Sequence, residues 1–513
     1  LLAKPDIQGT EVWADAKKAD PNLSDHLKVH KPYIDAVTYQ SPKDKSARMR
    51  RVTEVIDVWF DAGSMPFAQW GYPHVEGSEA LLWDRFPADF ISEAIDQTRG
   101  WFYALLAIST VIFCKDKAWP HPFKSCICLG HILGEDGTKL SKRLKNYSEP
   151  AILFEKFSAD ALRWSRIAKN PPTSSSRLSE RIVEEAQREL LVRWFNVYSF
   201  FVIYANLDGF DPSGAPAEFT NGLTSGNKKK DGKSTYSLRD SRGELDRWIL
   251  HELDRTVVEV RKAMDTLESY PAARLVSDFV DSLSNWYVRR SRPRFWASDW
   301  TQDKADAYWT LYECLLTLSR LAAPFTPFFT EVTWRNLSKP LPGAFESVHL
   351  AAYPEANPAN IDHALLRQME ITRQAVTLGL SARRTANLKV RQPLALGEIV
   401  LSDASLRPGL EKHLDLIMEE LNLKKLEFSD DPDQYVTYEV KPNFKVLGPK
   451  LGKKVKAVGA ALQKANGADL YAKLQQGSAT LEVDAESVSF SPEDLDVRLT
   501  PKEGFAAAQG RDM

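Results

Sequence analysis

The sequence has few cysteines and almost no net charge, and both shortages limit what the chain can be. Four cysteines in 513 residues are too few for the disulfide framework of a small secreted domain. Cys126 and Cys128 form a C-x-C motif, but no second Cys/His pair follows at zinc-binding spacing. We therefore expect buried free thiols, a reducing compartment and no structural zinc. The formal net charge is −2, so any surface that binds nucleic acid must be local.

Long apolar runs are missing as well. No stretch of about 18 uncharged apolar residues occurs, which predicts that nothing spans a membrane. The chain begins Leu-Leu-Ala-Lys, without a methionine or a signal-peptide pattern, and we interpret this as an interior start. Hydrophobic residues make up 43% and charged residues 27%, which indicates a soluble globular protein, and the length predicts several domains.

The patterning predicts four segments. Residues 1–52 are polar and irregular and look like the end of an insertion. Residues 53–150 suit an α/β domain. Residues 151–360 repeat a 3.6-residue periodicity, which predicts an all-α bundle, interrupted by a polar surface loop at 211–243. Residues 361–513 carry a Lys-rich stretch followed by alternating strands, which predicts a small α+β appendage that contacts RNA.

The α/β interpretation depends on the order of elements within the second segment. Residues 52–70 begin with a β-rich run that predicts a strand, and they turn at Ala62-Gly63-Ser64. Residues 88–113 predict a turn followed by a helix. SCICLGHILG (125–134) is a short apolar run of strand type and ends in a Gly-rich loop.

That loop, GTKLSKR (137–143), holds the first pattern that indicates chemistry. Lys139, Ser141 and Lys142 can reach around a triphosphate from a Gly-flanked loop. Lysine ammonium groups neutralise the charge that develops as pyrophosphate leaves. Taken alone, the pentapeptide is also typical of a solvated basic loop.

Longer motifs give a resemblance to a known family. FPADFISEAIDQTRGWFY (86–103) and DVWFDAGSMPFAQWGYP (57–73) resemble segments of isoleucyl-tRNA synthetases, which are class I aminoacyl-tRNA synthetases, in the form found in eukaryotes and some bacteria. NWYVRRSRPRFW (285–296) resembles the family's anticodon-binding helix. The lysine loop resembles its Lys-Met-Ser-Lys-Ser signature, departing at Leu140 and Arg143. The resemblance implies the C-terminal half of a Rossmann-type catalytic domain, followed by an anticodon-binding bundle and the appendage.

The resemblance also implies roles for the amino-acid and adenylate site. Trp59 and Trp101 would be the two aromatic walls of the isoleucine pocket. Glu93 would face the substrate ammonium, Asp96 would hold the ribose hydroxyls, and Gln97 would contact the amino acid or the adenylate carbonyl. Without the resemblance, core packing for the tryptophans and helix capping for the carboxylates are the simpler interpretations.

Two further sets of residues follow from the same resemblance. ATP, with Mg²⁺, would be held by Asp96, Lys139, Ser141 and Lys142, and both lysines would be catalytic. The bundle would bind tRNA through a basic and aromatic helix end. Its members are Trp286, Arg289, Arg290, Arg292 and Arg294. A solvated basic helix end is the alternative.

The implied activity is the ligation of isoleucine to tRNA-Ile through isoleucyl-adenylate, by a cytoplasmic monomer with isoleucine, ATP and tRNA-Ile as partners. The family's first signature, His-x-Gly-His, and its editing domain are not found. His-Ile-Leu-Gly at 131–134 only imitates the signature's letters. We therefore expect a C-terminal fragment that is inactive alone. A stand-alone tRNA-binding protein derived from a synthetase, and a valyl or leucyl synthetase, remain as alternatives.

Overall fold

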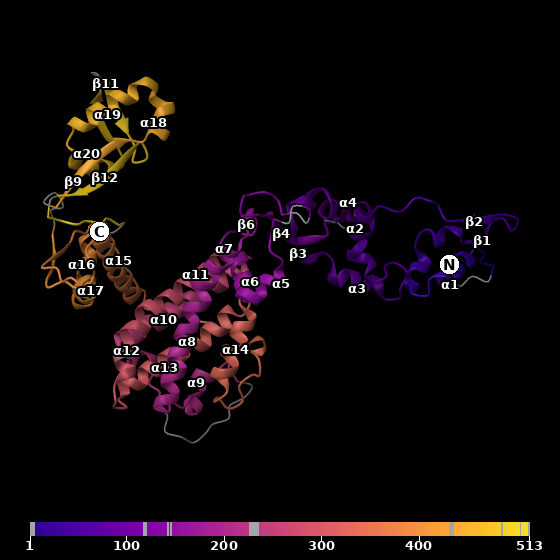
Figure 1. The fold of residues 1–513 in the computed structure, drawn as a ribbon, viewed down its shortest axis with the longest axis horizontal. Coiled ribbons are helices and arrows are strands. Elements are labelled where there is room, and N and C mark those ends of the chain that lie inside the picture. The colour runs from indigo at the N-terminus through magenta and orange to yellow at the C-terminus, as the bar shows by residue number, and fades with distance from the viewer. Residues whose placement is uncertain are drawn as a thin grey trace. The chain divides into compact units, whose positions relative to one another are not determined.

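The chain forms two compact units (Figure 1). The first comprises Leu1–Phe157 and Ser165–Glu184, and the second comprises Ser158–Trp164 and Glu185–Met513. The division into four segments stays a prediction. The computed structural model describes residues 6–115, 121–140, 143, 146–224, 235–401, 403–429, 435–483, 486–502, 504–510 and 513.

The first unit is built from short helices and short strands. In chain order its elements, where η marks a 3-10 segment, are α1 (Glu11–Ala19), η1 (Asp25–Val29), η2 (Tyr33–Ala36), β1 (Thr38–Gln40), β2 (Arg48–Arg50), α2 (Val58–Ala68), α3 (Ser78–Arg85), β3 (Ala88–Ala94), η3 (Ile95–Arg99), α4 (Trp101–Phe113), β4 (Phe123–Leu129), β5 (Ile132–Leu133), α5 (Pro150–Phe157) and β6 (Ser176–Arg177). Two helices, α6 (Ala159–Ile167) and α7 (Glu180–Ala186), contribute residues to both units.

A β-α-β arrangement organises this unit. β3 and β4 pair in parallel, with Ala88 opposite Phe123 and Ala94 opposite Leu129, and η3 and α4 connect them. A parallel pair needs such a crossover, usually a helix, so this region has the α/β character that the sequence predicts. The strand predicted at the start of residues 52–70 is wrong: the structure has no strand there, and α2 begins at Val58.

The second unit is mostly helical, and two of its η segments, η4 and η7, are π-helical turns that continue into the next helix. From residue 187 to the end of α15, its elements are η4 (Gln187–Val192), α8 (Arg193–Asp208), η5 (Pro212–Gly214), α9 (Ala217–Thr220), η6 (Arg239–Ser241), α10 (Glu244–Asp265), α11 (Ser269–Asp281), η7 (Ser282–Val288), α12 (Arg289–Trp296), α13 (Gln302–Ala322), α14 (Pro327–Ser338), η8 (Val348–Leu350), η9 (Pro358–Asn360) and α15 (His363–Thr385).

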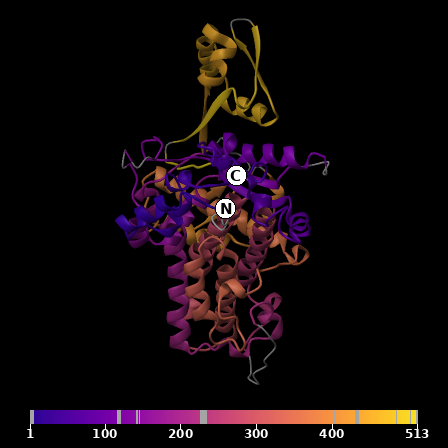
Figure 2. The same cartoon turned by 90° about the vertical axis from the view of Figure 1, so that its right-hand side faces the viewer.

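Aromatic side chains fill the core of this bundle. α13 is buried on nearly all sides and packs against α8 and α10, and Figure 2 shows the long helices side by side. Large aromatic rings bury much apolar area, which stabilises the packing of several helices at once. The fully buried rings of the bundle include Trp194, Trp248, Trp309, Trp334, Tyr287, Tyr308, Tyr312, Phe279 and Phe295.

Shorter elements follow α15. They are β7 (Gly397–Ile399), η10 (Ala404–Leu406), α16 (Arg407–Glu411), α17 (Leu414–Leu421), β8 (Leu426–Phe428), β9 (Val436–Pro442), α18 (Phe444–Leu451), η12 (Gly452–Lys454), α19 (Val455–Lys464), α20 (Gly467–Gln475), β10 (Ala479–Val483), β11 (Glu486–Phe490) and β12 (Leu495–Pro501). β7 and β8 pair in parallel, whereas β9 with β12 and β10 with β11 pair antiparallel.

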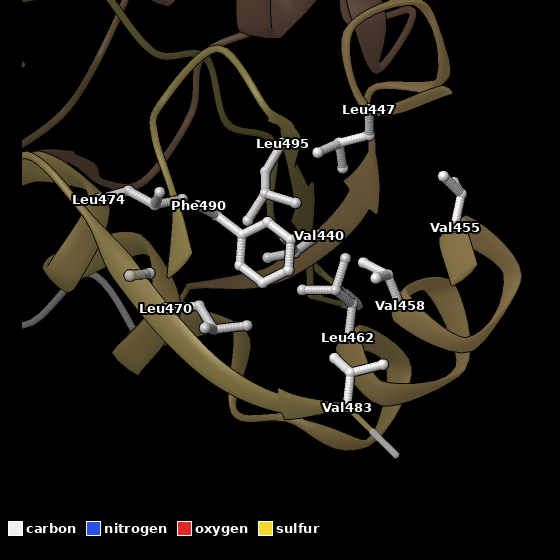
Figure 3. Close-up of a cluster of buried hydrophobic side chains, with 11 residues drawn as sticks. Val440, Leu447, Val455, Val458, Leu462, Leu470, Leu474, Val483, Phe490 and Leu495 are labelled. Carbon is white, nitrogen blue, oxygen red and sulfur yellow. The ribbon is translucent and has the colours of Figure 1, made fainter. Parts of the chain in front are cut away.

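The last strands and helices share a hydrophobic core of their own. α19 and α20 pack on β9, and Figure 3 shows the ring of Phe490 in the middle of the cluster with Leu470, Val440 and Leu495 around it. Helices on antiparallel strands are an α+β arrangement. This is the type of fold that the alternating pattern near the C-terminus indicates.

One helical run meets the length and composition of a membrane span. It covers Glu180–Asp208, and 28% of the apolar window is buried inside the structure. A core helix of a soluble bundle passes the same test, and Trp194, Val197 and Phe201 of this run are buried. The sequence prediction considered only stretches without charged residues, and it therefore did not identify this helix.

Candidate functional site

α2 begins at a capped end that carries Trp59. The Asp57 carboxylate accepts a hydrogen bond from the backbone N–H of Trp59 at 2.7 Å, which satisfies one of the donors that a helix start leaves unpaired. Local capping therefore favours a helix over the strand that the Val and Ile residues of this region suggest. The Trp59 side chain, 39% exposed, stays available for a ligand.

A glycine lets α2 approach α4 closely. A Cβ atom at Gly63 would lie 2.9 Å from the Cβ of Ala104 and 2.8 Å from Cδ1 of Ile108, so a larger residue would push the helices apart. Close approach also allows the indole Nε1–H of Trp101 to donate to the carbonyl of Ala62 at 3.1 Å. The contact between the two helices thereby fixes the orientation of the Trp101 ring.

Two of the side chains predicted to bind isoleucine lie against Gly100, and the backbone of a third follows it in the chain. A Cβ atom there would lie 2.6 Å from Oε1 of Gln97 and 3.0 Å from Cη2 of Trp59. Gln97 Oε1 also accepts a hydrogen bond from the backbone N–H of Trp101 at 3.1 Å. The structure therefore brings Trp59, Gln97 and Trp101 together, although they belong to α2, η3 and α4.

The two predicted carboxylates lie close by in the chain. Glu93 is near the end of β3, where its Oε2 accepts from the N–H of Ala94 at 3.3 Å. Asp96 stands in the first turn of η3. Both side chains are exposed, so each can accept hydrogen bonds from a ligand. Ligand sites in open α/β sheets commonly lie at the carboxyl ends of the strands.

The lysine loop starts as a tight turn. The N–H of Gly134 donates to the carbonyl of Thr138 at 2.8 Å, and Gly137 has a φ of +84°, a conformation that favours glycine. The Asp136 carboxylate accepts from the N–H and the hydroxyl of Thr138, which holds the pKa of that carboxyl below its usual range. Lys139 is exposed. The predicted ATP ligands Ser141 and Lys142 lie outside the described residues.

The predicted tRNA-binding residues of the second unit fall into three groups. Arg294 and Trp286 belong to the first group, because both are engaged inside the bundle. The guanidinium of Arg294 binds both oxygens of Asp246, at 2.8 and 2.7 Å, and the Trp286 ring is buried. The neighbouring Tyr287 is also buried, and its hydroxyl donates to Asp246.

Arg289 and Arg290 form the second group, and both contact α17. Arg290 binds Glu420 at 2.9 Å and Glu419 at 2.8 Å, and Arg289 also pairs with Glu420. The guanidinium groups are therefore close to acidic side chains of the same chain. The distance in sequence is about 130 residues, so no local pattern reveals this contact.

Arg292 alone makes up the third group, and two exposed tryptophans that the sequence analysis did not select follow it in the chain. Its side chain is exposed, and no hydrogen bond or ion pair holds it within the described part of the chain. One helical turn on, Trp296 is 58% exposed. Trp300 is also exposed and stacks on Tyr308, with the two ring centroids 5.4 Å apart. The spacing of four residues between Arg292 and Trp296 is the signal that could have identified this face.

A polar cavity of about 450 Å³ opens elsewhere in the second unit, between α8, α10, α11 and α15. Four arginines and four carboxylates line it, so their charges balance. Ion pairs join these groups, which indicates a network that connects helices. They are Arg193 with Asp281, Arg255 with Glu252, Arg274 with Glu189, and Arg373 with Asp281.

The cysteines differ from the sequence prediction in one respect. All four are free thiols, as expected, but Cys314 alone is buried. Cys126 is exposed and Cys128 half-buried, because they share one face of β4 and no residue of this strand is fully covered. No three His, Cys, Asp or Glu side chains of the described ranges lie close enough together to hold a metal ion.

Two family models match the chain. The model described as "tRNA synthetases class I (I, L, M and V)" matches residues 8–179. The model described as "Anticodon-binding domain of tRNA ligase" matches residues 246–399. The first match therefore falls mainly on the first compact unit, and the second match lies within the second unit.

Curated relatives are similar over most of this chain. The isoleucine–tRNA ligase of Streptomyces avermitilis is 42% identical over 490 residues, which cover 94% of this chain and 43% of the relative. The isoleucine–tRNA ligase of Dehalococcoides mccartyi is 46% identical over 417 residues, which cover 80% of this chain and 38% of the relative. The chain thus spans less than half the length of these relatives. Both are bacterial, and the eukaryotic-like form stays a prediction.

Among solved structures, the LeuRS of Agrobacterium radiobacter K84, in a ternary complex with tRNA and LeuAMS, is 15% identical with a TM-score of 0.47. The match covers 78% of this chain and 44% of that chain. A likeness of this strength carries no argument about the chain.

Proposed function

The chain belongs to the class I aminoacyl-tRNA synthetases, as a homologue of isoleucyl-tRNA synthetase with a class I catalytic domain and an anticodon-binding domain, and we propose that it serves the ligation of isoleucine to tRNA-Ile. The substrates are isoleucine, ATP with Mg²⁺, and tRNA-Ile, and the protein acts as a cytoplasmic monomer. The isoleucine carboxylate attacks the α-phosphorus of ATP, and pyrophosphate leaves. A ribose hydroxyl of the tRNA then attacks the isoleucyl carbonyl of the adenylate, the ester forms and AMP leaves.

The observation that carries this proposal is the contact of the Trp59 and Gln97 side chains with Gly100, together with the hydrogen bond from the Trp101 backbone N–H to Gln97. Two indole rings offer contact area to a branched alkyl group without demanding a polar partner. Gln97 provides a fixed amide for the amino acid or the adenylate carbonyl, and Glu93 faces the ammonium. The exposed Asp96 accepts from the ribose hydroxyls.

The lysine loop supplies the charge for adenylation. Pyrophosphate gains negative charge as the bond to the α-phosphorus breaks, and an ammonium held nearby stabilises that transition state more than bound ATP. Lys139 stands on the described part of the loop, and the motif assigns the same role to Lys142, with Ser141 as a further phosphate ligand. Most of the catalysis is positioning, because no covalent intermediate with the protein is required.

The second unit is proposed to hold the tRNA. Exposed arginine binds phosphate, and exposed tryptophan stacks on unpaired bases. Arg292 and Trp296 provide both on one face of α12, and Trp300 is a further exposed ring in the segment after it. Arg289 adds charge beside them where its guanidinium reaches solvent.

Titration calorimetry with a non-hydrolysable isoleucyl-adenylate analogue tests the amino-acid site in this chain. We expect the isoleucyl analogue to bind more tightly than the valyl and leucyl analogues, and Trp101→Ala to abolish most of the binding. Trp83→Ala is the matched control, because Trp83 packs on Phe113 and not at Gly100. Tighter binding of the valyl or the leucyl analogue than of the isoleucyl analogue would favour a valyl or leucyl relative. Binding of tRNA-Ile without any analogue binding would favour a stand-alone RNA-binding protein.

A further inference from the structure

Two neighbouring arginines of α12 are neutralised from within the chain. Glu420 of α17 lies between them, at 2.9 Å from Nη1 of Arg290 and in an ion pair with Arg289. Glu419 binds Nη2 of Arg290 at 2.8 Å. The Glu420 side chain is only 6% exposed, whereas that of Arg289 is 45% exposed. The acidic pair thus covers one side of the arginine pair and leaves another side open to solvent.

α17 does not need this contact to stay in place. Ile417 is fully buried, and Leu421 packs so closely on α15 that a Cβ atom at Gly379 would lie 2.4 Å from its Cδ1. The buried guanidinium of Arg383 also binds the carbonyl groups of Leu421 and Asn422. Because apolar packing and backbone hydrogen bonds hold α17 on α15, the glutamates are not required as its anchor.

Carboxylate and phosphate compete for the same groups. Both are oxyanions that a guanidinium fork binds with two parallel hydrogen bonds. A phosphate of RNA that reaches Arg289 from its open side meets a cation already paired with Glu420. The phosphate must therefore share or replace the carboxylate.

We propose that Glu419 and Glu420 occupy the phosphate-binding groups of Arg289 and Arg290 in the RNA-free chain, and that RNA displaces them. The inference rests on the proposed function, because it requires the second unit to bind tRNA. The ligand is the phosphate backbone, so displacement lowers the affinity for every RNA by a similar factor. Selectivity for one RNA then depends on other side chains, which stack on the bases or form hydrogen bonds with them.

The experiment measures tRNA-Ile affinity of the whole chain by fluorescence anisotropy at several salt concentrations. Coupling between two binding events on one protein commonly changes an affinity 5–150-fold, and for Glu419→Gln/Glu420→Gln we expect about tenfold tighter binding. Glu411→Gln is the matched control, since Glu411 is a surface residue paired with Arg407 within α16. Its effect measures the change in general electrostatics, which we expect to stay below about twofold for one charge.

A double-mutant cycle isolates the competition. In a chain that already carries Arg289→Gln/Arg290→Gln, the two glutamate substitutions should leave tRNA affinity unchanged. If the glutamate variant binds tRNA no more tightly than the wild-type chain, the displacement is wrong while tRNA binding stands. If neither the wild-type chain nor the glutamate variant binds tRNA, the proposed RNA-binding role fails and the inference fails with it.

A labelling measurement covers the case in which the glutamate variant does not fold. Carbodiimide coupling modifies carboxylates that reach solvent, and mass spectrometry locates the modified residue. In the wild-type chain we expect Glu420 to react slowly, and to react faster when tRNA-Ile is bound. Labelling of Glu411 should not change. Unchanged or slower labelling of Glu420 in the complex contradicts the displacement.

Discussion

Arg294 and Asp246 form a two-point ion pair inside the second unit. The two hydrogen bonds measure 2.8 and 2.7 Å, and the Asp246 side chain is 0% exposed. The Tyr287 hydroxyl donates to the same carboxylate, and burial together with that charge holds the pKa of Tyr287 well above its usual range. A carboxylate so enclosed depends on its arginine, because a buried charge without a partner is costly.

We therefore expect Arg294→Ala to lower the free energy of unfolding by about 3–5 kcal/mol, since the substitution leaves Asp246 buried and unpaired. Denaturant unfolding followed by circular dichroism measures this change. Arg292→Ala, two residues away on the exposed side, is the control and should change stability by less than about 0.5 kcal/mol. Similar values for the two variants would show that the ion pair does not stabilise the bundle.

Arg292, which should contribute little to stability, should contribute to RNA binding. Arg292→Ala should weaken tRNA-Ile binding and reduce the slope of log affinity against log salt by about one, because one phosphate contact is lost. Trp296→Ala should cost about 1–3 kcal/mol of binding if a base stacks on the ring. Anisotropy titrations at several salt concentrations measure both. Arg335→Ala, an exposed arginine of α14, is the control, and an equal loss there would mean that the binding is not localised.

Helical periodicity could predict which arginines share a face, but not what that face meets. Trp286, Arg290 and Arg294 recur every four residues, and so they lie on one side of the helix. Their partners come from far away in the sequence: Asp246 is 48 residues from Arg294, and Glu420 is 130 residues from Arg290. Tertiary contacts therefore decide which basic side chains remain exposed, and local spacing carries no information about them.

The residues of the proposed amino-acid site could be selected from the sequence, whereas the local structure around them could not. Resemblance alone selected Trp59, Gln97 and Trp101, and the structure brings them together. The secondary structure of α2 was missed because β-branched residues before it favour a strand. Capping by Asp57 and packing through Gly63 decide the outcome, and only the capping is local.

His413 should make stability depend on pH. Its side chain is 5% exposed, and Nε2 has no hydrogen-bond partner among the residues that the structure describes. Burial lowers the pKa of its imidazole below 6.5, against the attraction of Glu244. The unfolded chain therefore takes up a proton at a higher pH than the folded chain does. Stability is complete above about pH 6.5, the pKa of unperturbed histidine, and is lost as the pH falls from there toward the folded pKa.

The slope from this one group cannot exceed about 1.4 kcal/mol per pH unit. Denaturant unfolding of the wild-type chain and of His413→Gln between pH 8 and 5 isolates it, because other titrating groups affect both proteins alike. We expect the difference in stability between the two to shrink as the pH falls. A difference that stays constant over this range would show that His413 does not titrate differently in the two states.

Gly100 should control the geometry of the proposed isoleucine pocket. A methyl group there would lie 2.6 Å from Gln97 Oε1 and 3.0 Å from the Trp59 ring, distances at which one of the two side chains must move. If Gln97 moves, the hydrogen bond from the N–H of Trp101 at 3.1 Å is lost. If Trp59 moves, one wall of the pocket turns away. Gly100→Ala should therefore weaken binding of the isoleucyl-adenylate analogue by about 1–3 kcal/mol, the usual cost of overpacking.

Titration calorimetry of this variant distinguishes a local effect from general misfolding. Gly448→Ala is the control, because a Cβ atom at Gly448 meets nothing within 4 Å and should leave analogue affinity unchanged. Near-ultraviolet circular dichroism follows the tryptophan environments, and we expect a change for Gly100→Ala while its far-ultraviolet spectrum stays constant. A smaller partner tests the direction further: Trp59→Phe in the Gly100→Ala chain removes the ring atoms nearest the new methyl group. Affinity should then recover in part, whereas two additive losses would show that Gly100 acts through the backbone and not through the Trp59 wall.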